Sequence, residues 1–284
     1  MILSFHPCYG GDTNIICAGR EPGPQDIDAI QAADAVILPQ GCRASLYALC
    51  RKHCAHVFPN YDARFQYPGK TGQARLFQAM GAPHPETWIF PKLRVCEQVG
   101  RIPKTAFPLV LKLDWGGEGE AVFPVPGPAD LDRALETVRA YERSGQSGFV
   151  LQRYIPGVTR TLRVVVTGDL LTAYWRVQEN ADAFGTSVSH GARIDADSDP
   201  DLQQMGKHLT REFCEKTKIN LAGFDFIPEQ TPEGERLLFL EINYFFGRTG
   251  LGGSLAFYDR LQTVIQTWLS SLGRKPENAA GDMS

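Results

Sequence analysis

The apolar positions of this chain fall into two kinds of run, which predict strands and helices in different places. Short apolar runs predict β-strands over residues 35–39, 56–58, 107–113, 121–123, 149–155, 223–227 and 238–243, and a hairpin over 161–177. An amphipathic helical repeat predicts helices over residues 44–53, 70–80, 128–143, 202–216 and 254–269. Because strands and helices alternate as far as about residue 62, the first part should form a small parallel α/β domain. The expected fold class is α/β, with α+β character further along the chain.

Two of the predicted strands each carry an acid at an alternating position. Since side chains alternate along a strand, Glu241 and Asn243 should share a face with Phe239, opposite Leu238, Leu240 and Ile242. Asp225 lies on a common face with Gly223 and Ile227 in the same way. Oxygen ligands at alternate positions of a buried strand suit a hard cation such as Mg²⁺. The alternative interpretation is that Asp225 and Glu241 are solvated residues at strand ends.

The composition is that of an ordinary globular protein and excludes several classes of partner. The chain has 284 residues, of which 43% are hydrophobic and 21% charged, and its formal net charge is −3. This charge provides no basic field for nucleic acid or a membrane surface, and no apolar run is long enough to span a bilayer. The seven cysteines form no Cys-x-x-Cys pair, which favours reduced thiols. With no secretory signal pattern at the N-terminus, a cytoplasmic protein is expected.

Lys112 stands inside an apolar run that should be buried, directly before a glycine-rich turn. A buried ammonium without a partner is costly, so Lys112 either reaches solvent from an edge strand or has an anion as its partner. The turn that follows exposes backbone N–H groups that can close over phosphate oxygens. The pair predicts a phosphate-binding element made by Lys112 and the loop residues Gly116, Gly117, Glu118 and Gly119.

Arginines add a further positive element. A two-residue turn at Gly168-Asp169 places Arg163 and Arg176 as diagonal neighbours on the polar face of the hairpin. Two converging guanidinium groups suit a transferring phosphoryl group or a carboxylate, whereas the alternative is a solvated outer face. Arg248, shortly after the strand that carries Glu241, is a candidate for holding an anionic substrate, against an ordinary surface role.

Taken in order, these segments resemble the ATP-grasp superfamily, and most closely its glutathione synthetase and ribosomal-protein glutamate ligase branch. Members have a lysine at the start of a helix, which Lys70 matches, and a second lysine before a glycine-rich loop, which Lys112 matches. Arg163 resembles the arginine of the family's hairpin. The resemblance also assigns an adenine-binding hinge to Gln152, Arg153, Tyr154 and Ile155, and the magnesium ligands to Asp225, Glu241 and Asn243. The sequence departs from the family at Gly69, where an aspartate is frequent, and at Arg153, which replaces a common hinge glutamate.

The resemblance implies an ATP-grasp fold with three lobes and an ADP-forming ligase activity. The implied divisions are a Rossmann-like α/β domain over 1–68, a linker helix and lid over 69–155, a catalytic lobe over 156–273 and a disordered tail over 274–284. ATP and one or two Mg²⁺ ions would be bound between lid and catalytic lobe, where Arg163 and Arg176 would stabilise an acylphosphate. The partners would be a small-molecule or peptide carboxylate and an amine or thiol acceptor, in a possible homo-oligomer. A kinase that phosphorylates a hydroxyl and a non-catalytic nucleotide-binding module are the alternatives.

Overall fold

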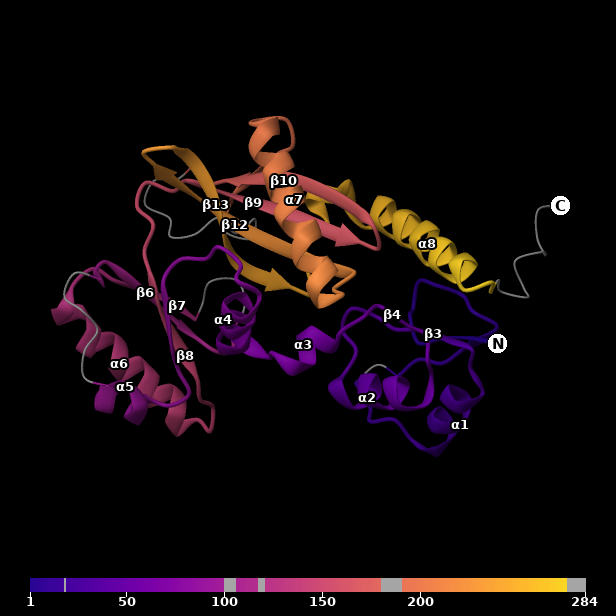
Figure 1. The fold of residues 1–284 in the computed structure, drawn as a ribbon. Helices are drawn as coiled ribbons and strands as arrows, with labels where there is room; N and C mark the ends of the chain where they lie inside the picture. Colours follow the sequence, from indigo (N-terminus) through magenta and orange to yellow (C-terminus); the bar gives the residue numbers. More distant parts are fainter. Residues whose placement is uncertain (18, 100–105, 117–120, 180–190, 275–284) are drawn as a thin grey trace.

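The computed structural model describes residues 1–17, 19–99, 106–116, 121–179 and 191–274. Within this part of the chain the strands form three sheets, one in each of the segments 1–68, 69–155 and 156–273. The three sheets and their helices form three lobes (Figure 1). The boundaries between lobes stay predictions, and the predicted loop residues Gly117, Glu118 and Gly119 and nearly all of the predicted tail lie outside the described residues.

The N-terminal lobe, here called the pre-domain, is built on a small parallel sheet in the order β2-β1-β3-β4. Strand order reverses between β1 and β3, so the carboxyl ends of these two neighbours meet at the place where open α/β sheets bind ligands. Three helices accompany the sheet. The bounds are β1 Ile2–Ser4, β2 Thr13–Asn14, β3 Ala35–Ile37, β4 Val57–Phe58, α1 Pro24–Ala32, α2 Ala44–His53 and α3 Asp62–Gln66.

The second lobe, the lid, is an antiparallel sheet in the order β5-β8-β6-β7, with α5 and α6 on one side (Figure 1). Phe90 and Phe149 stack inside it with ring centroids 5.1 Å apart. Helix α4 leads into this lobe and lies between the lid and the catalytic sheet (Figure 1). The bounds are α4 Gly69–Met80, β5 Thr87–Phe90, α5 Leu93–Val99, β6 Leu109–Leu113, β7 Val122–Val125, α6 Pro128–Arg143 and β8 Phe149–Arg153.

The third lobe is an antiparallel sheet in the order β11-β10-β9-β12-β13, covered on both faces. Helices α7 and α4 pack on one face around an aromatic core that includes Trp175, Phe213 and Phe224. Helix α8 packs on the other face, where it forms a second apolar core together with residues of the pre-domain. The bounds are β9 Arg160–Thr167, β10 Leu170–Val177, β11 Arg193–Asp195, α7 Pro200–Thr217, β12 Leu221–Thr231, β13 Gly234–Asn243, η3 Thr249–Leu251 and α8 Gly253–Ser271.

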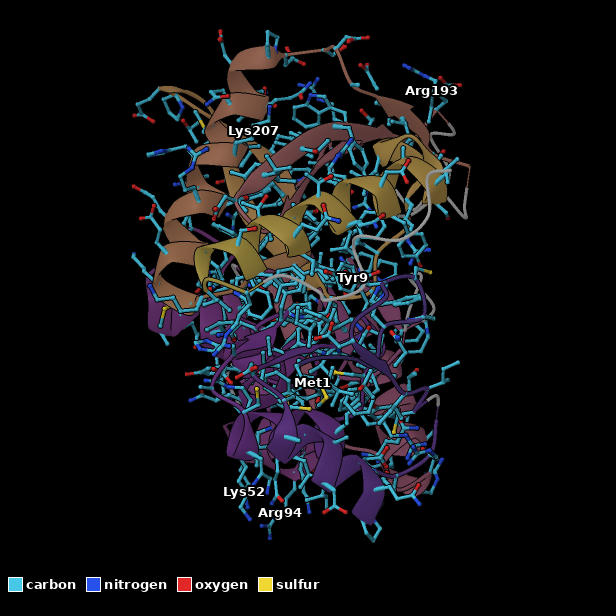
Figure 2. All side chains as sticks on the ribbon, turned by 90° about the vertical axis from the view of Figure 1, so that its right-hand side faces the viewer. Met1, Tyr9, Lys52, Arg94, Arg193 and Lys207 are labelled. Atoms are coloured by element: carbon cyan, nitrogen blue, oxygen red, sulfur yellow. The ribbon has the colours of Figure 1, made fainter. Side chains whose placement is uncertain are left out.

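The pre-domain packs against the third lobe at α8. Phe58 of β4 contacts Trp268 of α8, with ring centroids 5.5 Å apart. Figure 2 shows Tyr9 near the boundary between the pre-domain and α8, with Lys52 at the far end of the pre-domain. All seven cysteines are free thiols, and no helix in the described residues is long and apolar enough to cross a membrane.

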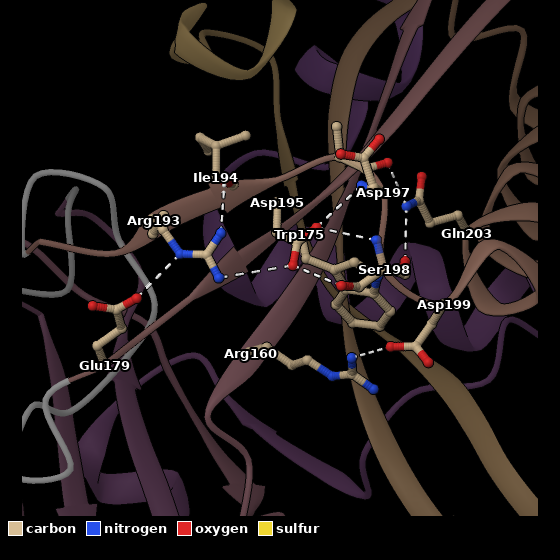
Figure 3. A network of polar contacts seen from close by, with 11 residues as sticks. Arg160, Trp175, Glu179, Arg193, Ile194, Asp195, Asp197, Ser198, Asp199 and Gln203 are labelled. Atoms are coloured by element: carbon tan, nitrogen blue, oxygen red, sulfur yellow. Dashed lines mark hydrogen bonds and ion pairs between the residues drawn. The ribbon is translucent and has the colours of Figure 1, made fainter.

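A polar network fixes the connection between β11 and α7 beside Trp175 (Figure 3). The indole of Trp175 donates to the Ser198 carbonyl at 2.8 Å, and the Asp195 carboxylate accepts the N–H of Ser198 at 3.0 Å. Arg160 lies 4.1 Å from the Trp175 ring and forms an ion pair with Asp199, directly before α7. These contacts fix the start of α7 against the sheet without taking part in the cleft.

One prediction about the faces of β13 is wrong, and a β-bulge is the reason. The pairing between β12 and β13 shifts after Asp225, so Phe226 faces Phe239 while Asp225 faces Glu241, and Leu240 is the extra residue. Phe239 and Ile242 consequently both enter the aromatic core, and Glu241 lies on the other side. Simple alternation had placed Phe239 beside Glu241. Because of the bulge, β13 places Phe239 and Ile242 in the core and Glu241, between them in sequence, in the cleft lining.

The corrected face of Phe239 can be tested by two matched truncations in one segment. Phe239 is 1% exposed and contacts four other phenylalanine rings, whereas Phe245 is 72% exposed. Phe239→Ala should lower the free energy of unfolding by about 3–5 kcal/mol, because it leaves a cavity in the core. Phe245→Ala should change it by less than about 0.5 kcal/mol. Urea denaturation measures both; equal effects would contradict the bulged register.

Candidate active site

A buried carboxylate held by two arginines forms the centre of the site. The hairpin register is the predicted one, with Arg163 opposite Tyr174 and Arg176 opposite Thr161. Arg163 donates to both oxygens of Asp225 at 2.6 Å, and Arg176 approaches Oδ2 at 3.0 Å. Burial by itself would raise the pKa of Asp225, but the two guanidinium groups outweigh it and hold this pKa below its ordinary value. Asp225 is therefore ionised, and its charge is more than balanced.

Glu241 and Asn243 lie beside this carboxylate. Asp225 is the register partner of Glu241, and the amide of Asn243 donates to Asp225 Oδ2 at 3.0 Å. Gln73 of α4 bonds both the N–H and the carbonyl of Ile242 at 2.8 Å, as a neighbouring strand would. Since β13 is an edge strand, this contact satisfies the free backbone groups of Ile242 and fixes the position of the adjacent Glu241.

Lys112 reaches the same place from the lid. Burial lowers its pKa to about 8, although the nearby charges of Glu241 and Asp225 act in the opposite direction. Lys70 also lies close enough to disfavour the Lys112 charge, and its own Nζ donates to the Gly116 carbonyl at 2.9 Å. The two lysines that the sequence analysis singled out thus meet each other and Glu241. Neither lysine has a carboxylate oxygen within 4.0 Å among the described residues.

A cleft of about 280 Å³ opens at this point between α4, the start of the glycine-rich loop and β13. Lys70, Gly116 and Glu241, all predicted site residues, line it. The sequence analysis missed several other lining residues, which are Arg64, Phe65, Gln73, Asp114, Trp115 and Tyr244. Tyr244 and Trp115 directly adjoin predicted motifs, and this adjacency was the one available signal; nothing in the sequence pointed to Arg64 or Gln73.

Asp114 explains the glycine at position 69. The Thr71 N–H donates to Asp114 Oδ1 at 2.7 Å, so this carboxylate caps the N-terminus of α4, where the helix dipole favours negative charge. Gly69 has a φ of +69°, and a Cβ there would lie 2.5 Å from the Asp114 oxygens. The Asp114 carboxylate, which follows β6 of the lid, therefore occupies the space that a side chain at position 69 would need.

The residues present suit a magnesium ion only together with phosphate oxygens. No group of three or more His, Cys, Asp or Glu side chains in the described part of the chain could hold a metal ion alone. Among the described residues, Asp225 Oδ2 receives Arg163, Arg176 and Asn243, whereas Oδ1 receives only Arg163 Nε, which leaves it a lone pair for a further ligand. Glu241 forms no ion pair within 4.0 Å among the described residues. This donor set fits Mg²⁺, which binds through one or two carboxylates and completes its shell with phosphates and water.

The hinge residues predicted for adenine binding have other partners in the structure. The Gln152 amide is buried and donates to Thr87 Oγ1 at 2.9 Å, and Arg153 forms an ion pair with Glu229 at 2.5 Å. The N–H of Tyr154 donates to the Pro108 carbonyl at 3.0 Å, and Ile155 is buried. The role of this segment in adenine binding stays a prediction. Arg248 lies outside the cleft lining, at the boundary with the pre-domain.

Solved structures with this arrangement of lobes are ATP-grasp proteins. The RimK domain ATP-grasp protein from Sphaerobacter thermophilus is 18% identical, with a TM-score of 0.57 over 81% of each chain. D-alanyl-alanine synthetase A from Vibrio cholerae is 14% identical, with a TM-score of 0.59 over 83% of this chain and 77% of that one. Carboxyaminoimidazole ribonucleotide synthase from Aspergillus clavatus, solved with ATP, is 15% identical, with a TM-score of 0.54 over 80% and 57%. No family model and no curated protein matches the sequence. The chain has the ATP-grasp fold, so the predicted fold class is confirmed.

Lys112 should lower the stability of the protein at neutral pH. Because its folded pKa of about 8 lies below the ordinary lysine pKa of 10.5, the unfolded chain binds the proton more tightly. The resulting penalty is complete below pH 8 and disappears as the pH rises toward 10.5. Lys112→Met should therefore raise the free energy of unfolding at pH 7, by up to about 3 kcal/mol at 1.36 kcal/mol per pKa unit. Urea denaturation at pH 7 and pH 10 measures this gain.

The control for this experiment is Lys52→Met on the exposed surface of α2, which should change stability little at either pH. A gain for Lys112→Met that is the same at pH 7 and pH 10 would mean that packing, and not charge, is responsible.

Asp114 should stabilise α4 through its contact with the helix N-terminus. Asp114→Ala removes the acceptor of the Thr71 N–H and should lower the free energy of unfolding by about 1 kcal/mol, as for other helix caps. Asp132→Ala, at an exposed position of α6, is the matched control and should be nearly neutral. Thermal unfolding of both variants tests this; equal midpoints would show that the cap contributes nothing.

Proposed function

We propose that this protein is an ATP- and Mg²⁺-dependent ligase that joins a carboxylate to an amine or thiol and releases ADP and phosphate. The observation that carries the proposal is the convergence of Lys70, Lys112, Arg163 and Arg176 on Asp225 and Glu241, beside a cleft. With Arg64 and Asp114, which also line the cleft, five cations accompany three acids there, and this excess of positive charge suits a triphosphate. The structural neighbours add support, since one is named a D-alanyl-alanine synthetase and another was solved with ATP.

Each cation has a separate task in the proposed reaction. Lys70 and Lys112 approach the triphosphate from α4 and from the lid, and Gly116 lies beside Lys70. Arg163 and Arg176 are fixed by Asp225, so their orientation is set before substrate arrives, which is the condition for effective electrostatic catalysis. Backbone groups of the segment 152–155 are the proposed contacts of the adenine.

Glu241, Asp225 Oδ1 and Asn243 are the proposed ligands of magnesium. When bound, the ion neutralises charge on the β- and γ-phosphates. Gln73 contributes indirectly, because its two bonds to Ile242 hold Glu241 in place at the end of β13.

The proposed chemistry has two displacements. An oxygen of the substrate carboxylate attacks the γ-phosphorus, and the bond to the β-phosphate oxygen breaks. ADP is the leaving group, and the substrate becomes an acylphosphate. The amine or thiol then attacks the acyl carbon, phosphate departs with the electron pair of the C–O bond, and the nucleophile gives up its proton. Arg163 and Arg176 bind the negative charge that develops on the transferred group and on the acyl oxygen. Positioning and electrostatics supply most of the acceleration.

Glu241→Gln tests this proposal with the smallest change of shape. The variant should fold normally and lose about 10²-fold or more of ADP release in the presence of MgATP, an acid and an amine, because a carboxylate ligand proposed for magnesium is replaced by a neutral amide. Glu233→Gln, in the exposed turn between β12 and β13, is the control and should keep full activity.

The products distinguish the alternatives. Unchanged ADP release by Glu241→Gln would contradict the assignment of this site. A stable phosphorylated product would indicate a kinase, and tight ATP binding without turnover over a broad panel of acids and amines would indicate a non-catalytic module.

A further inference from the structure

Two arginines near the pre-domain, Arg64 in the cleft lining and Arg248 outside it, have no acidic partner among the described residues. Arg64, which lines the cleft, lies over the rings of Tyr61 and Phe65 at 5.0 and 4.9 Å. Arg248 lies over Phe257 and Tyr258 at 5.1 and 4.5 Å. By contrast, Arg163 and Arg176 of the catalytic centre both face a carboxylate. Aromatic faces orient a guanidinium group but leave its charge uncompensated.

One neutral residue joins these two arginines. Gln40 follows β3 and is 4% exposed; its backbone carbonyl accepts Arg64 Nη1 at 2.6 Å, and its Oε1 accepts Arg248 Nη2 at 3.2 Å. The Gln40 amide donates in turn to the Tyr244 carbonyl, which keeps the side chain in place. Two positive charges are therefore held near each other by a residue that carries none. The buried Nε of Arg248 has no hydrogen-bond partner at all in the described structure.

His6 of the pre-domain, close to Arg248, adds a hydrogen-bond donor and no negative charge. Burial, assisted by Arg248, lowers the pKa of His6 to about 4, so its ring is neutral at pH 7. The Cys8 N–H donates to His6 Nδ1 at 3.1 Å, which places the ring proton on Nε2. His6 and Gln40 follow β1 and β3, and the group thus lies at the carboxyl ends of these strands, where the strand order reverses.

We propose that Arg64, Gln40 and Arg248 form a subsite for a second carboxylate of the acid substrate, so that this substrate is a dicarboxylic acid. The inference rests on the proposed function and narrows its substrate class. Arg64 borders the same cleft as Lys70 and Glu241, so an acid whose reacting carboxylate lies at the phosphate end extends its other end toward the pre-domain. Guanidinium forks match the two oxygens of a carboxylate, and the anion supplies the negative charge that the subsite lacks.

The probes are succinate, glutarate and adipate, each compared with its own monoamide. The monoamide keeps the length and one carboxylate, and replaces the other with a neutral group. With MgADP present, the dicarboxylates should raise the thermal midpoint, and their apparent affinity should exceed that of the monoamides by about 10–100-fold for at least one length, the range expected of charged hydrogen bonds. ADP release with MgATP, and hydroxylamine as the nucleophile, is the second readout.

Variants locate the effect. Arg64→Gln and Arg248→Gln should each remove most of the preference for the dicarboxylate, mainly through KM, while MgADP binding is kept. Arg64→Lys retains the charge and should retain part of the preference, which separates charge recognition from loss of packing on Tyr61. Arg75→Gln, at an exposed position of α4, is the control and should behave as the unmodified protein.

Equal affinity for dicarboxylates and monoamides at all three lengths would overturn the subsite. So would a preference that survives in both glutamine variants. In either case MgADP binding and Glu241-dependent ADP release can persist, so the proposed ligase function would stand. Absence of nucleotide binding would instead overturn the proposed function, and the subsite with it.

Discussion

The ion cluster of Asp225 with Arg163 and Arg176 is the constraint on which the rest of the site depends. Three neighbouring strands, β10, β9 and β12, each contribute one member, so the cluster forms only when the sheet has the observed register. Removing one partner of such a buried pair leaves an uncompensated charge and is strongly destabilising. The same contacts fix the orientation of both guanidinium groups. Stability of the catalytic sheet and preorganisation of the site are thus one feature of the structure.

The buried Lys112 lowers the stability of the folded protein, and the contacts of Asp114 and Gln73 nearby raise it. Lys112 is held where burial disfavours its charge, and a bound triphosphate would relieve this penalty. Asp114 and Gln73 act in the other direction, since one caps α4 and the other completes the edge of β13. Both contacts end on α4, which makes this helix the common support of the lid loop and of Glu241. A ligand that binds the cleft therefore touches lid, linker helix and catalytic sheet together.

Much of this organisation was predictable from local sequence, because strands and turns obey local rules. The two-residue turn at Gly168-Asp169 fixed the hairpin register, and with it the meeting of Arg163 and Arg176. The face of Phe239 was not predictable, because a bulge breaks the alternation on which the prediction relied. Contacts between distant segments were also missed. Gln73 bonds a strand 169 residues away. Arg64 lines the cleft only because the pre-domain packs beside it, which local sequence does not reveal.

Calorimetric titration with MgATP tests the central claim most directly, namely that the cleft concentrates positive charge around a triphosphate. The account predicts that the unmodified protein and Lys52→Met bind MgATP with equal affinity, and that Lys112→Met binds it at least about 10-fold more weakly, a loss of roughly 1.4 kcal/mol. Lys112→Met should keep the fold of the unmodified protein, so that its weaker binding reports the lost charge. Equal affinity for all three proteins, or no binding by any of them, would contradict the account.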